Sequence, residues 1–97
     1  MPAYLIANAE VTDPAAYERY RSAVPAVIAQ YGGRYLVRGG ETDVPEGTFP
    51  GARFVVLEFP DIAAAGAFWR SPEYTEVKKL RDGAAQMNIA IVDGYVP

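Results

Sequence analysis

Residues 53–59 read Arg-Phe-Val-Val-Leu-Glu-Phe, and this stretch decides the fold of the 97-residue chain. The run is apolar at nearly every position, and Glu58 is its one internal charge. A strand with one face in water alternates apolar and polar side chains, whereas a continuous apolar run is typical of a strand buried on both sides. The sequence therefore predicts a strand at Arg53–Phe59 that is covered on both faces.

The N-terminal part of the chain predicts a strand followed by a helix. Residues 3–11 alternate with a period of two, which is typical of a strand. One face of this strand carries Leu5, Ala7, Ala9 and Val11, and the other carries Tyr4, Ile6, Asn8 and Glu10. Asp13 and Pro14 are typical of an N-cap and a first helical position, and apolar side chains follow at helical spacing as far as Tyr31. Pro25 lies inside this helix and predicts a kink or short break near residues 21–24, because proline has no N–H to donate.

A second strand and a loop connect this helix to residues 53–59. The Gly32-Gly33 pair ends the helix, because glycine tolerates the left-handed backbone of a C-cap. Arg34–Arg38 predicts a short strand, and the Gly39-Gly40 pair predicts a bulge at its end. Residues 41–44 can continue the strand, and residues 45–51 are rich in proline and glycine and predict a loop.

The C-terminal part predicts two helices and a last strand. Asp61 caps a helix at Ile62–Arg70, Ser71 begins a second helix that runs from residue 74 to about 85, and residues 87–96 form a strand. The order is strand, helix, strand, strand, helix pair, strand. Two right-handed crossovers joined by a hairpin give one βαββαβ domain of the α+β class that spans residues 1–97. Its four-stranded antiparallel sheet has all its helices on one face.

The sheet face without helices predicts a homodimer. This face carries Tyr4, Ile6 and one side of residues 53–59. A contiguous apolar patch of this kind promotes aggregation unless something covers it. We therefore expect the sheets of two copies to pair face to face, with a barrel-like cavity between or within the subunits.

The composition excludes several classes of chemistry. The chain contains no Cys and no His, so it offers no thiolate nucleophile, no imidazole base, and no sulfur or histidine ligand for zinc or haem. We expect no cofactor and no metal. The net charge is -3 and no run of Lys and Arg is present, so we expect no nucleic-acid partner. No apolar run reaches the length of a membrane span and no signal peptide is visible, so we expect a cytoplasmic protein without membrane contact.

Polar side chains within strands are the candidates for function. Arg38 could bind a carboxylate or enolate, and Glu58 could act as a base with a pKa raised by burial. Alternatively, Glu58 or Glu10 pairs with Arg34 or Arg38 and only fixes the strand register. Asn8 either holds a substrate oxygen or satisfies a backbone group near the strand end. Trp69 either lines an apolar ligand pocket with neighbouring aromatic side chains or belongs to the core.

Several motifs cover nearly the whole chain and resemble a known bacterial family. They are Val11-Thr-Asp-Pro14, residues 31–40 (YGGRYLVRGG), residues 56–60 (VLEFP), residues 68–74 (FWRSPEY) and residues 91–94 (IVDG). Together they resemble the family known as domain of unknown function 1330, and residues 48–52 depart most from its pattern. The resemblance implies the dimeric α+β-barrel (ferredoxin-like) superfamily, which includes cofactor-independent monooxygenases, haem-degrading enzymes, lactone isomerases and stress-related dimers.

The resemblance implies a fold but no particular reaction, so two functions stay open. In the first, the protein is a dimeric barrel that binds a small organic ligand in its cavity. In the second, it is a cofactor-independent enzyme, similar to a monooxygenase or isomerase, that acts on a small aromatic or carbonyl-bearing substrate. In both, the pocket residues are Asn8, Arg38, Glu58 and Trp69, and the first three are the catalytic candidates.

Overall fold

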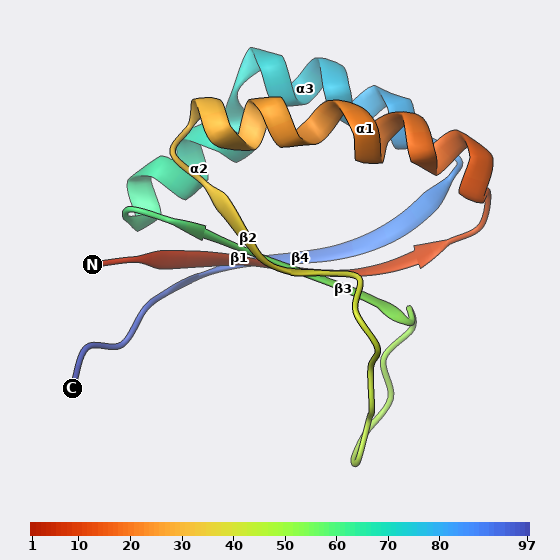
Figure 1. Ribbon diagram of the computed structural model, residues 1–97, viewed down its shortest axis with the longest axis horizontal. Helices are drawn as coiled ribbons and strands as arrows, with labels where there is room; N and C mark the ends of the chain where they lie inside the picture. The colour runs from red at the N-terminus through yellow and green to blue at the C-terminus, as the bar shows by residue number, and fades with distance from the viewer.

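Four antiparallel strands form one sheet in the order β2-β3-β1-β4 in the computed structural model, which describes all 97 residues. The strands are β1 (Ala3–Val11), β2 (Arg34–Arg38), β3 (Arg53–Phe59) and β4 (Ala85–Asp93). The helices are α1 (Pro14–Gln30), α2 (Ile62–Arg70), α3 (Pro72–Lys78) and the short 3₁₀ helix η1 (Lys79–Arg81). All helices lie on one side of the sheet (Figure 1). This architecture confirms the predicted α+β βαββαβ fold with helices on one face.

The helices begin where their capping residues predict. Asp13, Asp61 and Ser71 each accept a hydrogen bond from the backbone amide three residues on, at 3.1, 2.8 and 3.0 Å. The last helical segment is shorter than predicted, because α3 ends at Lys78 and η1 replaces the continuation towards residue 85. Gly83, in the left-handed conformation at φ +72°, then turns the chain into β4. None of the helices combines the length and apolar character that crossing a bilayer demands.

The first helix continues through Pro25, so of the predicted kink or short break the break is wrong. α1 is a single helix of 17 residues with this proline inside it. Proline leaves the carbonyl four residues earlier without its usual helical donor, and that carbonyl belongs to Arg21. In the structure the Arg38 guanidinium donates to it, with an Nη2···O distance of 2.9 Å. A side chain from β2 thus supplies the hydrogen bond that the helix lacks.

The bulge in β2 is also not where the sequence predicted it. The pairing of β2 with β3 shifts between Tyr35 and Val37, not at the Gly39-Gly40 pair. Residues 41–44 do not continue the strand. The bulge leaves Leu36 as the extra residue, so Arg38 pairs with Val55. A one-residue shift moves every later side chain to the opposite face of the sheet.

The last strand runs two residues further towards the N-terminus than predicted and ends three residues earlier. It spans Ala85–Asp93 instead of residues 87–96. After Asp93 the Gly94 amide donates to the Pro2 carbonyl at 2.8 Å, and the remaining residues lie outside the sheet.

The two faces of the sheet differ as the alternation in β1 predicts. On the helix face, Leu5 and Ala7 pack with Leu57 and Phe59 against the aromatic and aliphatic side chains of the helices. The other face, here called the open face, carries neighbouring side chains of β1 and β3: Tyr4 beside Glu58, Ile6 beside Val56 and Asn8 beside Phe54. Every residue of β3 is at least partly buried within a single copy of the chain.

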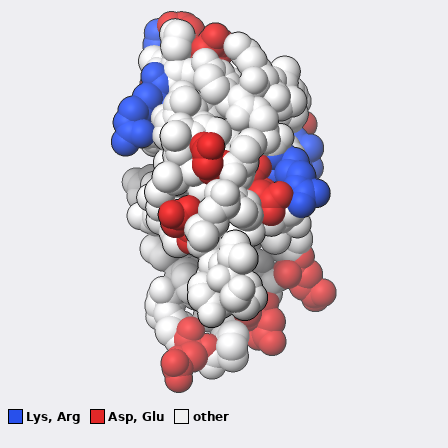
Figure 2. Space-filling view, turned by 90° about the vertical axis from the view of Figure 1, so that its left-hand side faces the viewer, with Lys and Arg blue, Asp and Glu red and all other residues white.

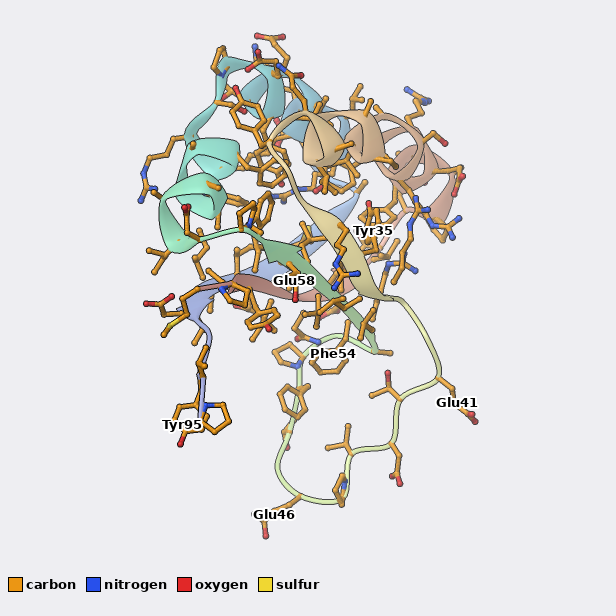
Figure 3. The ribbon with its side chains drawn as sticks, turned by 60° about the vertical axis from the view of Figure 1, so that its left-hand side comes forward. Tyr35, Glu41, Glu46, Phe54, Glu58 and Tyr95 are labelled. Atoms are coloured by element: carbon orange, nitrogen blue, oxygen red, sulfur yellow. The ribbon has the colours of Figure 1, made fainter.

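A long loop between β2 and β3 projects from the open face (Figure 1). Residues 39–52, here called the arm, contain Glu41, Asp43 and Glu46 and no basic residue. The lower part of the surface in Figure 2 is accordingly acidic. In Figure 3, Phe54 points away from the helices towards the arm, where its ring lies edge-on to that of Phe49 with 5.0 Å between centroids.

Candidate functional site

A small apolar cavity lies between the sheet and the helices. It encloses about 40 Å³, which is room for roughly three water molecules, and it is open to solvent on one side. Fourteen of its seventeen lining residues are hydrophobic. The other three are arginines, Arg21, Arg38 and Arg53. An apolar pocket with a few convergent polar groups is the usual form of a small-molecule site.

The three arginines come from three different elements. Arg38 ends β2 on the helix face because of the bulge, and its guanidinium lies 4.6 Å from the centroid of the Tyr35 ring. Arg53 begins β3 and lies 5.6 Å from the centroid of the Tyr17 ring. Its guanidinium occupies the place that a Cβ at Gly39 would take. Arg21 projects from α1, one turn after Tyr17.

These arginines have very little negative charge around them. The one ion pair among them joins Arg21 to Glu18 at 3.5 Å, between two solvent-exposed side chains. Such a surface pair contributes little to stability. The Nε atoms of Arg21 and Arg53 are buried and have no hydrogen-bond partner. Guanidinium groups with so few acidic partners at a cavity are suited to an anionic ligand.

The phenol of Tyr35 lies within the field of all three arginines. Burial raises the pKa of Tyr35, and the positive charges of Arg38, Arg53 and Arg21 oppose this rise. The tyrosine therefore stays a neutral phenol at physiological pH, and the cavity walls contain positive charge without a titratable base.

The sheet separates the four predicted pocket residues into two pairs. Arg38 and Trp69 line the cavity on the helix face. Asn8 and Glu58 lie on the open face, with the whole thickness of the sheet between them and the cavity. The centroids of the Trp69 and Tyr74 rings lie 5.1 Å apart, and Lys78 Nζ lies 4.8 Å from the centroid of the Trp69 ring.

Both open-face residues make the structural contacts that the sequence left open as alternatives. Glu58 Oε1 accepts hydrogen bonds from Arg34, at 2.8 Å from Nη2 and 2.9 Å from Nε. The buried Asn8 amide holds the base of the arm: Nδ2 donates to the Gly51 carbonyl at 2.9 Å, and Oδ1 accepts from the Gly51 amide at 3.2 Å. A Cβ at Gly51 would overlap the carbonyl of Ala9.

Sequence reasoning missed Arg21 and Arg53 as cavity residues, although both carried a signal. Arg21 follows Tyr17 by four residues, so it lies beside the apolar stripe of α1. Arg53 has the same parity as Leu57 and Phe59, so strand alternation places all three on the helix face.

An antiparallel four-stranded sheet with helices on one face, and a cavity between the two layers, defines a ferredoxin-like α+β protein. The chain belongs to the DUF1330 family, a domain of unknown function whose sequence profile matches residues 2–95. This match confirms the family resemblance found in the sequence motifs. No curated protein matches the chain.

Solved structures with the same fold include proteins of unknown function and one enzyme. A protein of unknown function from Rhodopseudomonas palustris has a TM-score of 0.73 at 21% identity, over 99% of this chain and 84% of that one. A dimeric ferredoxin-like protein of unknown function from Thermobifida fusca has a TM-score of 0.67 at 15% identity, over 97% and 92%. SnoaB from Streptomyces nogalater, a cofactor-independent oxygenase, has a TM-score of 0.66 at 13% identity, over 99% and 95%. At these identities the likeness concerns the fold alone.

Proposed function

We propose that the cavity between the sheet and the helices binds a small organic anion. The observation that carries this proposal is the convergence of Arg21, Arg38 and Arg53 on an otherwise apolar cavity, with one exposed carboxylate as their only acidic partner. In a chain of net charge -3, this is a local excess of positive charge. The guanidinium groups bind the carboxylate or enolate of the ligand, and the aromatic walls contact its apolar part.

The size of the cavity restricts the ligand. A space of about 40 Å³ takes only a few non-hydrogen atoms, because an empty cavity that binds benzene measures about 150 Å³. The ligand is therefore either a short-chain acid or a larger acid whose remaining atoms extend through the open side of the cavity.

Binding is favoured over turnover because the cavity lacks an acid–base pair. Its ionisable lining consists of arginines and tyrosines, whereas Glu58, the candidate base, pairs with Arg34 on the other face of the sheet. The alternative is a cofactor-independent enzyme acting on a small aromatic or carbonyl-bearing substrate. The likeness in fold to an oxygenase of that kind is its support.

We also propose that the protein works as a homodimer whose open faces meet. This face presents Ile6 with 38% of its surface exposed and Val92 with 47%. The arm and the C-terminal tail both project on this side and flank the sheet (Figure 1). In a dimer with two-fold symmetry, each copy would cover the open face of the other. A relative of the same fold is described as dimeric.

Matched acids and amides test the binding site. We would titrate the ¹⁵N-labelled protein with benzoate and benzamide, and with isobutyrate and isobutyramide, and measure Kd from amide shifts. Each acid should bind at least about tenfold more tightly than its amide, because a hydrogen bond to a charged group contributes about 1.5–3 kcal/mol. Arg53→Met should remove this preference. Arg34→Met is the matched control on the open face and should leave it intact. Equal binding of acid and amide, or equal losses in both variants, would contradict the proposal.

A further inference from the structure

Two tyrosines and an arginine form a second polar cluster, inside the core and next to the cavity. Tyr20 comes from α1, Tyr74 from α3 and Arg81 from η1. The two phenol oxygens share a buried hydrogen bond of 2.9 Å, and both tyrosines line the cavity. The guanidinium carbon of Arg81 lies 5.5 Å from the centroid of the Tyr20 ring.

Arg81 is a buried cation without a carboxylate partner. Only 9% of its surface is exposed, and its Nε atom has no hydrogen-bond partner. Burial alone would lower the pKa of Arg81, but hydrogen bonding and charge interactions with Tyr74 and Tyr20 outweigh this effect and raise it. The arginine is thus always charged, and the two phenol oxygens are its polar neighbours. Burying a cation without a carboxylate partner is costly unless neighbouring polar groups interact with its charge.

The hydrogens of this cluster leave one donor unused. A guanidinium group can only donate, whereas a phenol hydroxyl donates once and accepts, so Arg81 cannot take up either of the two phenol hydrogens. Burial and the neighbouring Tyr74 raise the pKa of Tyr20 far above neutrality, so its hydroxyl keeps its proton. Tyr20 and Tyr74 together hold two hydroxyl hydrogens, and their shared bond uses one. The other has no acceptor in the protein.

We propose that this remaining hydroxyl hydrogen is donated to an acceptor oxygen of the bound ligand, so that the site selects a carbonyl-bearing organic anion such as an oxo acid. The carboxylate of the ligand faces the arginines at the cavity, and its carbonyl oxygen faces Tyr20 and Tyr74. Arg81 is a positioning residue, because its charge fixes the direction in which the two hydroxyls donate. This inference rests on the proposed function and adds the chemical class of the ligand.

Pairs of probes that differ only at the acceptor test the inference. Pyruvate and methacrylate differ by one oxygen against one methylene group, and 4-oxopentanoate and 4-methylenepentanoate repeat this difference at a longer distance from the carboxylate. We would measure the Kd of all four by amide shifts. In at least one pair the Kd of the carbonyl probe should be lower than that of its methylene partner by a factor of about five or more. A single hydrogen bond changes Kd by a factor of this size.

Variants then locate the donor. Tyr20→Phe and Tyr74→Phe should each abolish or reduce this ratio while leaving the Kd of the methylene probe unchanged. Arg81→Met should reduce the ratio, and Arg81→Lys, which keeps a positive charge, should restore part of it. Tyr17→Phe is the matched control, because Tyr17 lines the same cavity and lies outside the cluster. General structural damage would weaken both probes alike and would leave their ratio unchanged.

The outcomes separate the two proposals. If the acids bind but neither pair shows a preference for the carbonyl probe, the inference is wrong and the anion site stands. The inference is also wrong if the preference survives both tyrosine substitutions. If none of the acids binds, the anion site and the inference fall together.

Discussion

The hydrogen bond between Arg38 and α1 predicts an energetic coupling between two residues that are far apart in the sequence. Arg38 Nη2 donates to the Arg21 carbonyl at 2.9 Å. This carbonyl has no helical donor because Pro25 has no N–H. Replacing the proline by alanine supplies the missing helical donor. The Arg38 side chain should then contribute less to stability than it does in the natural chain.

The size of the coupling follows from the contacts of Arg38. In the natural chain, Arg38→Ala removes one hydrogen bond, worth about 0.5–1.5 kcal/mol, and the contact with the Tyr35 ring, worth about 0.5–1 kcal/mol at an exposed site. In the Pro25→Ala background only the ring contact is lost. The cost of Arg38→Ala should therefore fall by about 0.5–1.5 kcal/mol.

Urea unfolding of the four proteins in this double-mutant cycle measures the coupling. Free energies of unfolding are compared at one protein concentration, because a dimer's stability depends on it. Distant, independent sites add within about 0.3–0.5 kcal/mol. If Arg38→Ala lowers the free energy of unfolding equally in both backgrounds within that limit, the hydrogen bond from Arg38 to the Arg21 carbonyl does not stabilise the fold. Arg38 then does not replace the donor that Pro25 removes from the helix.

Three further predictions concern the open face and the surface. Asn8→Ala should lower the free energy of unfolding in urea by about 2–4 kcal/mol, because two buried backbone groups of Gly51 lose their partner. Asn88 lies directly opposite Asn8 on β4 and is exposed, so Asn88→Ala should change the free energy of unfolding by no more than about 0.5 kcal/mol. Equal losses in Asn8→Ala and Asn88→Ala would contradict the role given to Asn8. Ile6→Asp should convert the proposed dimer into a monomer in sedimentation velocity, whereas Ala15→Asp on the exposed start of α1 should not. A dimer that persists in Ile6→Asp would place the interface elsewhere. Hydrogen bonding from Tyr31 lowers the pKa of Glu73 below 4.5, so this contact stabilises the fold above that pH and its contribution is lost as the pH falls through the lowered pKa. Tyr31→Phe should accordingly destabilise the protein in urea at pH 7 but not below the lowered pKa, and a pH-independent difference would argue against the contact.

Features that depend on neighbouring residues could be predicted from the sequence. The caps at Asp13, Asp61 and Ser71 follow from side chains that reach an amide three residues away. The two faces of β1 follow from strict alternation. The largely apolar run at Arg53–Phe59 predicted a strand covered on both faces, and every residue of β3 is at least partly buried.

Features that depend on contacts between distant elements could not be predicted. The helix survives Pro25 because a side chain from β2 replaces the missing donor, and no pattern within α1 indicates this. The candidate site was half predicted for the same reason. Arg38 and Trp69 line the cavity, but the face of the sheet on which Arg38 lies depends on the position of the bulge in β2, which the sequence placed at the Gly39-Gly40 pair.

The bulge in β2 links these observations, because it decides which face receives each arginine. Arg34 and Arg38 are four residues apart, so a regular strand would place both on the same face. The extra residue at Leu36 separates them: Arg34 pairs with Glu58 on the open face, and Arg38 turns to the cavity and to α1. Without the bulge, the guanidinium groups of Arg34 and Arg38 would both lie on the open face and share the single carboxylate of Glu58. The second copy of the proposed dimer would then bury one arginine without an acidic partner, at considerable cost. The cavity would lose one of its three arginines, and α1 would lose the donor that bridges its proline. A single inserted residue therefore serves the helix, the cavity and the proposed dimer interface together.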